Sequence, residues 1–443
     1  MQIITDLHIH SKYSRAVSPK MNLEEMAIWA SKKGIDLIAT ADWAHPIWFR
    51  EICSSLKEVE SGIFTLKKRP KEQKHDVKFL LSFEISSIYA QGDKTNRRVH
   101  NLIFSPSLST CEKIIKKLTS LGVNLISDGR PITGISSKNL IEIVLEIDEK
   151  AMLIPAHIWT PWFSMFGSNS GFDSISECFG DYKKYIYGIE TGLSSDPIMN
   201  WQIKELENRS ILSFSDAHSG PKIGREATVF VSKEPKFNYS YNDIERAIKQ
   251  DKKGHLEIGY TIEFFPEEGK YHLSGHRNCN IKYDVFDVKE KGKICPVCKK
   301  PLTIGVKNRV SDLSNKILKK TDLLFKKNKV GVTFVSDKNK KRRPFVSIIP
   351  LQEILIEVNN NSKAKGLKEY ERLTNFFGTE FDILLKMPYE EIENIGGIKL
   401  KKAIEKMRER SVYIDAGYDG VFGIVKVFDE KHEKKEKKQL GLF

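Results

Sequence analysis

The sequence has no long apolar run, since no stretch approaches the roughly 18 residues that a membrane-spanning helix requires. It begins without the charged and apolar regions of a signal peptide, so we expect no export. We therefore predict no membrane association and a cytoplasmic location. Hydrophobic residues make up 40% of the 443 residues, a normal share for a globular protein of two or three domains.

Cysteine is scarce, with six residues in the whole chain. Cys53, Cys111 and Cys178 are scattered, whereas the other three lie close together between positions 279 and 298. This pattern is unlike a disulfide framework and is typical of free thiols plus one metal site in a reducing compartment.

Acidic residues are outnumbered, 58 against 72 lysines and arginines, which gives a formal charge of +14. Such an excess favours a polyanionic partner, most often nucleic acid, and would suit a nucleoid-associated protein. A lysine-rich surface that serves solubility alone is the alternative.

Residues 1–234 alternate apolar runs with amphipathic stretches. We predict strands at 3–8, 36–40, 77–83, 99–104, 152–156, 187–190 and 211–214, and helices at 23–33, 111–121, 137–149 and 197–208. Asn22 is the candidate N-cap and Gly34 the candidate C-cap of the first helix. Repeated strand–helix units predict an α/β fold with a parallel sheet. A barrel is favoured because polar clusters follow nearly every strand, and a closed ring brings strand ends to one point.

The rest of the chain divides into three further parts. Residues 255–310 surround the cysteine cluster and are too few for a core of their own. Residues 311–430 predict a mainly helical domain, with helices at 311–335 and 350–410, strands at 412–428 and a basic loop at 337–344. Residues 431–443 form a charged tail.

A metal site is predicted at the first strand, which carries Asp6, His8 and His10. Side chains alternate along a strand, so these three point to one side while Leu7 and Ile9 point to the other. Two ordinary surface histidines would be the alternative if the motif stood alone. Further candidate ligands follow the other apolar runs: Asp42, His45, Glu84, His100, His157, Glu190, Asp216 and His218.

This set of imidazoles and carboxylates resembles the polymerase-and-histidinol-phosphatase (PHP) superfamily, whose fold is a distorted (β/α)7 barrel with up to three metals. The resemblance implies phosphoester hydrolysis with zinc, and with Mg²⁺ or Mn²⁺ for activity. It also implies that His8, His10, Glu84 and Asp216 hold one metal, that Glu84 bridges to a second metal on His100 and His157, and that His45 and His218 match a third site.

Two details of this assignment stay open. Trp43 and Ala44 separate Asp42 from His45, whereas family members often have adjacent Asp-His, so Asp42 is either a ligand or a neighbour of one. Arg130 and Arg225 would neutralise phosphate charge, or else are surface arginines.

A structural zinc site is predicted from His276-x2-Cys279 followed by Cys295-Pro-Val-Cys298. Two short chelating pairs close a tetrahedron and stabilise a segment without its own core. His272 is an alternative to His276. A redox CxxC is the other interpretation, but no thioredoxin-like helix follows it.

The C-terminal region carries two further motifs. Gly396-Gly397 lies between helical segments and resembles a helix-hairpin-helix, whose second helix would present its amides to a DNA phosphate. A plain helix-turn-helix that packs against the core is an equally good interpretation of these residues. The last residues resemble the motif by which bacterial repair proteins bind the sliding clamp (β clamp) through Gln439, Leu440, Leu442 and Phe443.

Over its whole length the chain resembles the endonuclease Q family, in domain order and in segments such as Thr-Ile-Glu-Phe-Phe-Pro-Glu-Glu-Gly-Lys-Tyr-His and Gly-Tyr-Asp-Gly-Val-Phe-Gly. This implies nicking of double- and single-stranded DNA on the 5′ side of deaminated bases (uracil, hypoxanthine, xanthine) and of abasic sites. A pocket for a flipped base would draw on Trp159, Trp162, Phe163, Ser168 and Asn169, unless that loop simply packs on the barrel. A 3′ exonuclease, a phosphatase and an inactive clamp-bound adaptor are the alternatives.

Overall fold

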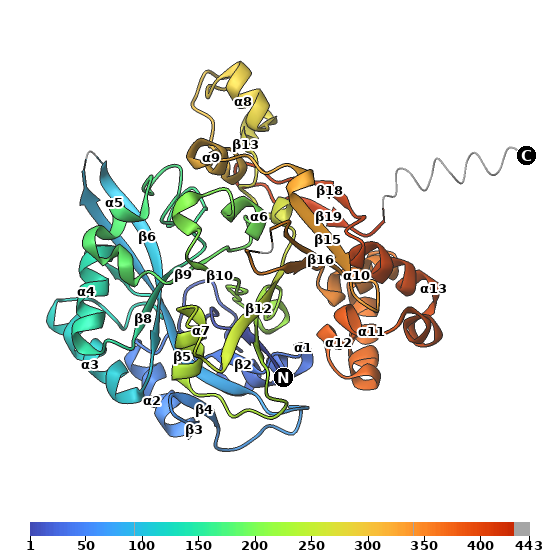
Figure 1. Ribbon diagram of the computed structural model, residues 1–443, viewed down its shortest axis with the longest axis horizontal. Helices are drawn as coiled ribbons and strands as arrows, with labels where there is room; N and C mark the ends of the chain where they lie inside the picture. Colours follow the sequence, from blue (N-terminus) through green and yellow to red (C-terminus); the bar gives the residue numbers. More distant parts are fainter. Residues whose placement is uncertain (93, 340, 429–443) are drawn as a thin grey trace, which may run out of the picture.

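A computed structural model describes residues 1–92, 94–339 and 341–428 (Figure 1). The predicted clamp peptide at 439–443 lies outside the described residues. Among the residues that are described, no helix combines the length and the apolar character that crossing a membrane would need.

Seven strands surround the core of the N-terminal region, and each overlaps a predicted strand. β1, β2 and β5 run parallel, β6 is antiparallel to both β5 and β8, and β9 is parallel to β10. The mixed α/β class is confirmed. The strands are β1 (Gln2–Asp6), β2 (Leu37–Ala39), β5 (Lys78–Gln91), β6 (Lys94–Ser105), β8 (Met152–Pro155), β9 (Gly188–Glu190) and β10 (Ser210–Leu212).

No continuous ladder closes these seven strands into a ring within the described part of the chain. Individual backbone contacts span the two gaps instead. Ile158 N–H donates to the Glu190 carbonyl at 3.2 Å between β8 and β9, and an isolated bridge joins Ile9 beyond β1 to Ala217 beyond β10. The strand ends therefore still converge at one place.

The expectation of a fully parallel sheet is wrong because β5 and β6 form one long hairpin with no helix between them. Their register runs from Leu81 opposite Ser105 to Tyr89 opposite Arg97. This pairing extends both strands past their predicted ends. Glu84 and His100 consequently lie inside strands, on the same face two positions apart across the hairpin.

Helices pack outside the strands, at the left of Figure 1 for α2 to α5. The predicted caps of α1 are present, since the Asn22 side chain accepts from Glu25 N and Gly34 is left-handed. These helices are α1 (Leu23–Lys33), α2 (Pro46–Ser55), α3 (Leu108–Ser120), α4 (Ser137–Ile147), α5 (Ile175–Phe179), α6 (Pro197–Asn200) and α7 (Tyr241–Ile248).

The helix predicted at 197–208 is limited to α6 and a separate 3₁₀ turn at Lys204–Leu206. Long-range hydrogen bonds replace helical ones here. Arg342 donates to the carbonyls of Leu206 and Glu207 at 3.0 Å, and Lys204 N donates to the Asn315 side chain. Tertiary contacts thus override the amphipathic pattern of this segment.

Five of these seven strands belong to a 13-stranded sheet, whereas β9 and β10 form a separate two-stranded sheet. β11 pairs with β1, β12 with β11, and β17 with β12, so the C-terminal part of the chain joins the sheet of the N-terminal part. The added strands are β3 (Leu56–Glu60), β4 (Ile63–Leu66), β7 (Ile132–Thr133), β11 (Ala227–Ser232), β12 (Leu256–Glu263), β15 (Leu323–Lys327), β16 (Thr333–Asp337) and β17 (Phe345–Ser347).

The predicted helix at 311–335 is wrong. Helix α9 (Val306–Leu313) ends early, and β15 and β16 form an antiparallel pair. A turn between them is fixed by Asn328, whose side chain accepts from Val330 N and Val332 N. Pairing of β16 with β17 then adds both strands to the sheet edge.

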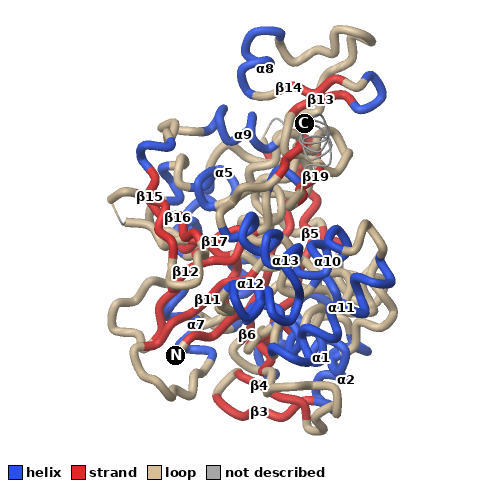
Figure 2. The backbone as a smooth tube through the Cα atoms, turned by 90° about the vertical axis from the view of Figure 1, so that its right-hand side faces the viewer, coloured by secondary structure: helices blue, strands red, loops and turns tan. Residues whose placement is uncertain are grey.

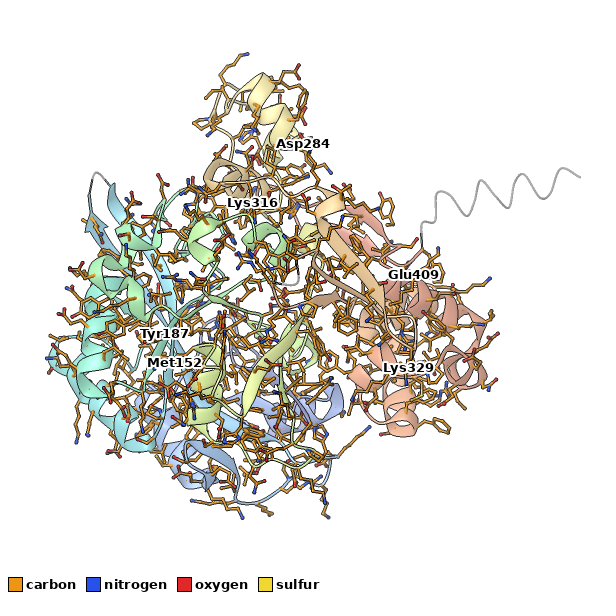
Figure 3. All side chains as sticks on the ribbon, viewed as in Figure 1. Met152, Tyr187, Asp284, Lys316, Lys329 and Glu409 are labelled. Carbon is orange, nitrogen blue, oxygen red and sulfur yellow. The ribbon has the colours of Figure 1, made fainter. Side chains whose placement is uncertain are left out.

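The cysteine-rich module projects at the top of Figure 1, and Figure 3 labels Asp284 within it. It holds β13 (Ser274–His276), β14 (Ile281–Tyr283) and α8 (Val285–Lys291).

The C-terminal region contains the predicted helices and two strands, beside α1 in Figure 2. A buried ion pair joins it to the N-terminal region, with Lys33 Nζ of α1 at 2.7 Å from Glu380 Oε2 of α12. Its elements are α10 (Leu351–Val358), α11 (Lys363–Phe377), α12 (Glu380–Leu385), α13 (Tyr389–Arg408), β18 (Tyr413–Asp415) and β19 (Ile424–Lys426).

Candidate active site

Glu84 of β5 stands at the centre of the predicted ligand set. Its Oε1 lies 2.7 Å from His100 Nδ1 and 3.1 Å from His157 Nε2, and its Oε2 lies 3.4 Å from His10 Nε2. His8 Nε2 is 3.7 Å from Oε1. A carboxylate approached from both sides by imidazoles is placed to bridge two metals.

Asp216 completes the set from the loop after β10. Its Oδ1 is 3.1 Å from His10 Nε2 and 3.6 Å from His8 Nε2. The donor atoms fall into three groups, each within 4.8 Å: His8, His10 and Glu84; His10, Asp216 and His218; and Glu84, His100 and His157.

The donor atoms fit divalent metal ions. Four buried atoms at the centre have no hydrogen-bond partner within the described residues, namely His8 Nε2, His10 Nε2, His100 Nδ1 and Asp216 Oδ1. They lie close to opposing carboxylates or imidazoles but are not aligned as hydrogen bonds, as expected of atoms directed at a shared ion. Nitrogen and carboxylate oxygen donors suit zinc, manganese or iron.

Two buried carboxylates orient the imidazoles. His8 Nδ1 lies 2.9 Å from Glu190 Oε1, and His10 Nδ1 lies 3.3 Å from Asp42 Oδ1. A proton held at Nδ1 leaves Nε2 of each ring as the donor to a metal. Glu190 also accepts from His157 N at 2.7 Å. Both acids therefore contact candidate ligands, and Asp42 lies beside the candidate ligand His10.

Charge in the centre is balanced between the rings and the carboxylates. Burial disfavours a charged ring at His8, but Glu190, Asp216 and Glu84 outweigh it and raise its pKa well above the usual value. Burial acts to raise the pKa of Glu84, but His100 and Arg130 overcome it and lower that pKa well below its ordinary value. Glu84 is thus kept as a carboxylate, the form that binds cations.

Two predicted ligands lie apart from the cluster. Both Asp6 oxygens accept backbone N–H groups, from Ser215 and Gly224 at 2.9 Å, so Asp6 fixes the loop that carries Asp216. The His45 ring stacks on Tyr13, and its Nε2 lies 3.2 Å from the Ile126 carbonyl oxygen. The structure therefore does not bring His45 to His218.

A cleft of about 840 Å³ opens onto the centre. This is a size typical of small-molecule pockets. Arg130 lines the cleft and lies 3.1 Å from Glu84, and Arg225 lines it while donating to the Ser215 carbonyl at 2.8 Å. Its wall also includes His100, His157, Asp216, His218, Trp162, Phe163, Lys270, Tyr271 and Phe422.

The predicted base-contacting residues separate into two groups. Trp162 and Phe163 line the cleft. Trp159 does not, because it is 1% exposed and its Nε1 donates to Asn200 at 2.8 Å. Ser168 donates to the Ile304 carbonyl, and Asn169 lies on the surface outside the cleft lining. Sequence reasoning missed Lys270, Tyr271 and Phe422, which come from segments far along the chain.

The glycine pair lies in α13, where two helical segments meet. Gly397 has φ 81° and ψ 165°, a conformation that a side chain disfavours, and an added Cβ there would meet no atom within 4 Å among the described residues. The backbone therefore turns at an open position, as a hairpin between two helices requires.

The zinc prediction has a compact donor set. His276, Cys279, Cys295 and Cys298 place their donor atoms within 4.8 Å of one another. His272 is instead buried away from them, and burial lowers its pKa to about 4. The four grouped residues are compatible with a tetrahedral zinc site.

The chain is similar in sequence to known proteins. Residues 350–411 match the family model described as MJ0043 C-terminal domain. The uncharacterized protein MJ0043 of Methanocaldococcus jannaschii is 28% identical over 280 residues, which are 62% of this chain and 32% of that protein. The uncharacterized protein YqxK of Bacillus subtilis is 26% identical over 444 residues, covering 96% of this chain and 99% of YqxK.

Two solved structures match over the whole chain. The lesion-specific endonuclease PfuEndoQ from Pyrococcus furiosus is 29% identical with a TM-score of 0.78, and the match covers 100% of both chains. Endonuclease Q bound to a 27-mer duplex with an abasic lesion at its active site is 30% identical with a TM-score of 0.79, covering 97% of this chain and 98% of that one. This chain belongs to the endonuclease Q family. Membership in the endonuclease Q family makes the chain a nuclease and confirms the resemblance that its sequence predicted.

Proposed function

We propose that this endonuclease Q family member is a DNA repair enzyme that hydrolyses the phosphodiester on the 5′ side of deaminated bases and abasic sites. The products would carry a 3′-hydroxyl and a 5′-phosphate. The observation that carries the proposal is one cleft that is lined by aromatic side chains and by four members of the candidate ligand cluster: Trp162, Phe163, His100, His157, Asp216 and His218.

We assign His8, His10, Glu84 and Asp216 to one metal, with Glu84 shared with a second on His100 and His157. His218 would serve a third metal. Divalent metals at such a site polarise a phosphoryl group and supply a nucleophile from water near neutral pH. Zinc fits these donors, and we expect Mg²⁺ or Mn²⁺ to support activity.

The chain's own residues then hold the substrate. Arg130 lies at the cleft wall beside Glu84, where its guanidinium would neutralise charge on the phosphate being cleaved. Arg225 keeps the Asp216 loop in place through the Ser215 carbonyl and the Asp216 carbonyl at 3.2 Å. Phe163, under the Arg98 guanidinium, offers a surface for a base or sugar ring.

A second contact to DNA is proposed at the glycine hairpin in α13. The N–H groups that follow Gly396 and Gly397 would bind a backbone phosphate away from the cleft. This contact would position the duplex without reading its sequence.

Cleavage of an internally labelled duplex tests the proposed reaction. Uracil, hypoxanthine and an abasic analogue are each placed at one position, with undamaged DNA beside them, in Mg²⁺ or Mn²⁺. We expect one nick 5′ of each lesion and none in undamaged DNA. Asp216→Asn should abolish the nick, whereas Asp181→Asn, an exposed acid outside the cleft, should retain it.

The same gel separates the alternatives. A ladder that grows from the 3′ end would replace the proposal by a 3′ exonuclease. Lesion binding without cleavage by the wild-type protein would instead indicate a DNA-binding adaptor.

We also propose that Gln439, Leu440, Leu442 and Phe443 bind a bacterial sliding clamp. The support is the sequence motif that follows the charged segment at 431–438. Deleting 439–443 should abolish co-elution with the clamp and leave nicking of naked DNA unchanged. Equal co-elution of the truncated and full-length chains would refute this partner.

A further inference from the structure

Phe422 is an apolar side chain held out at the edge of the catalytic cleft. It is 69% exposed, yet it lines the same cleft as Asp216, His100 and His157. An isolated exposed phenylalanine on a surface has no special meaning, but one beside a charged active site is unusual. We therefore expect an apolar or aromatic group of the substrate to contact the Phe422 ring.

The loop that carries Phe422, residues 417–423, is fixed at both ends. Gly417 N donates to the Glu267 carbonyl at 2.8 Å, and Gly423 N donates to the Glu268 carbonyl at 3.0 Å. A Cβ at Gly423 would lie 2.1 Å from the Glu267 oxygen, so the two backbones approach as closely as glycine allows.

The turn inside this loop is fixed as well. Tyr418 and Val421 exchange backbone hydrogen bonds at 3.0 and 2.8 Å, and Gly420 N donates to the Lys270 carbonyl at 2.8 Å. Asp419 accepts from Arg277 N at 2.7 Å and from the Thr303 hydroxyl, both of the cysteine-rich module. The tip is thus anchored to two other segments, and Phe422 is presented on a supported turn.

The surroundings of Phe422 suit a DNA strand. Lys270 Nζ lies 5.7 Å from the Phe422 ring centroid and 5.6 Å from that of Tyr271. Tyr271 meets Trp162 edge to face at 5.6 Å across the cleft wall. An exposed cation between aromatic faces matches the alternation of phosphate and base along one strand.

We propose that Phe422 is a wedge that enters the base stack at the lesion and occupies the space left when the damaged nucleotide turns into the cleft. Extruding a nucleotide removes its stacking, which costs a few kcal/mol in duplex DNA. An inserted aromatic ring restores stacking with the neighbouring base pair. The inference rests on the proposed lesion-directed function, and it assigns Phe422 a positioning role separate from the chemistry.

The first test compares cleavage by Phe422→Ala with the matched control Phe286→Ala, which removes a phenylalanine of equal 69% exposure outside the cleft lining. Loss of one stacking contact should slow nicking of a uracil duplex on the order of tenfold. Nicking of single-stranded uracil DNA, which has no duplex stack to open, should fall much less. Phe422→Trp should restore the duplex rate.

The second test measures stacking without cleavage. In an Asp216→Asn background, a 2-aminopurine next to the uracil reports extrusion by a rise in fluorescence, which Phe422→Ala should suppress and Phe286→Ala should not. The wedge would be overturned if Phe422→Ala and Phe286→Ala gave equal fluorescence and equal ratios of the duplex nicking rate to the single-strand nicking rate. A Phe422-dependent signal from a protein whose wild type cuts no DNA would support the wedge and refute the proposed nuclease function, so the two can fail separately.

Discussion

Replacing Glu190 by glutamine tests whether the buried carboxylates set the metal affinity of the centre. Glu190 lies 2.9 and 3.1 Å from His8 Nδ1 through its two oxygens and accepts from His157 N at 2.7 Å. The carboxylate holds a proton at Nδ1 of His8 and leaves Nε2 for the metal. A glutamine amide can donate to Nδ1 instead, which places the ring proton on Nε2 and blocks ligation.

The expected size of the effect follows from this geometry. Glu190 is fully buried, so water cannot replace the acceptor that His8 Nδ1 loses. His8 in turn belongs to the candidate ligand cluster. Loss of such a supporting carboxylate typically costs about 10–100-fold in metal affinity. Glu190→Gln should therefore shift the Mn²⁺ concentration for half-maximal nicking upward by that factor, with partial recovery of the rate at saturating metal.

The assay is a metal titration of nicking on apo-reconstituted protein, with Glu149→Gln as an isosteric control on the surface. The control should titrate like the wild type. An unchanged midpoint for Glu190→Gln would refute the orienting role, and a reduced rate with no change in midpoint would place Glu190 in the chemistry instead.

Three further predictions concern stability. Lys33→Met leaves the Glu380 carboxylate buried without its partner between α1 and α12, so urea unfolding should show a free energy of unfolding lower by about 3–5 kcal/mol. The double variant Lys33→Met/Glu380→Gln should regain most of this loss. If the effects of the two substitutions simply added, the pairing would be contradicted. Burial raises the pKa of Asp196 to about 6. The contribution of Asp196 to the free energy of unfolding is therefore fully present below its ordinary pKa and is lost as the pH rises through 6. Asp196→Asn can still cap Met199 N and should be more stable than wild type by up to about 3 kcal/mol at pH 7.5 but not at pH 4; equal gains at both would refute this. Cys298→Ser should lose one zinc per chain by mass spectrometry and expose the 274–300 segment to proteases, and retention of that zinc would contradict the assigned donor set.

Much of the fold could be predicted from local signals in the sequence. Asn22 and Gly34 bound α1 as predicted because a cap depends on a few neighbouring residues. The helix prediction for 311–335 is wrong because β15 pairs with β16, β16 with β17, and β17 in turn with β12, far earlier in the chain. Sequence periodicity cannot report such a partner.

The candidate site likewise has features that neighbouring residues determine and features that distant partners determine. The approach of His8, His10 and Asp216 to one another was predictable because each ends or follows an apolar run of the N-terminal region. The roles of Asp6 and His45 were not, since they are decided by backbone groups of Ser215, Gly224 and Ile126 that sequence does not place nearby. Phe422 escaped notice for the same reason, although the surrounding glycines marked a tight loop.

Backbone strain is concentrated at three residues of the candidate site. Asp42, His157 and Asp216 all have positive φ, at 41°, 28° and 47°, in a region that costs non-glycine residues about 1–3 kcal/mol each. Each is held there by a hydrogen bond from another protein group or to one: Ser11 N–H donates to Asp42 at 2.7 Å, His157 N–H donates to Glu190, and Arg225 donates to the Asp216 carbonyl. Protein groups therefore fix the backbone of these three residues. Donors held in this way would bind the proposed metals with little rearrangement, so that more of the binding free energy would be available for holding the scissile phosphate.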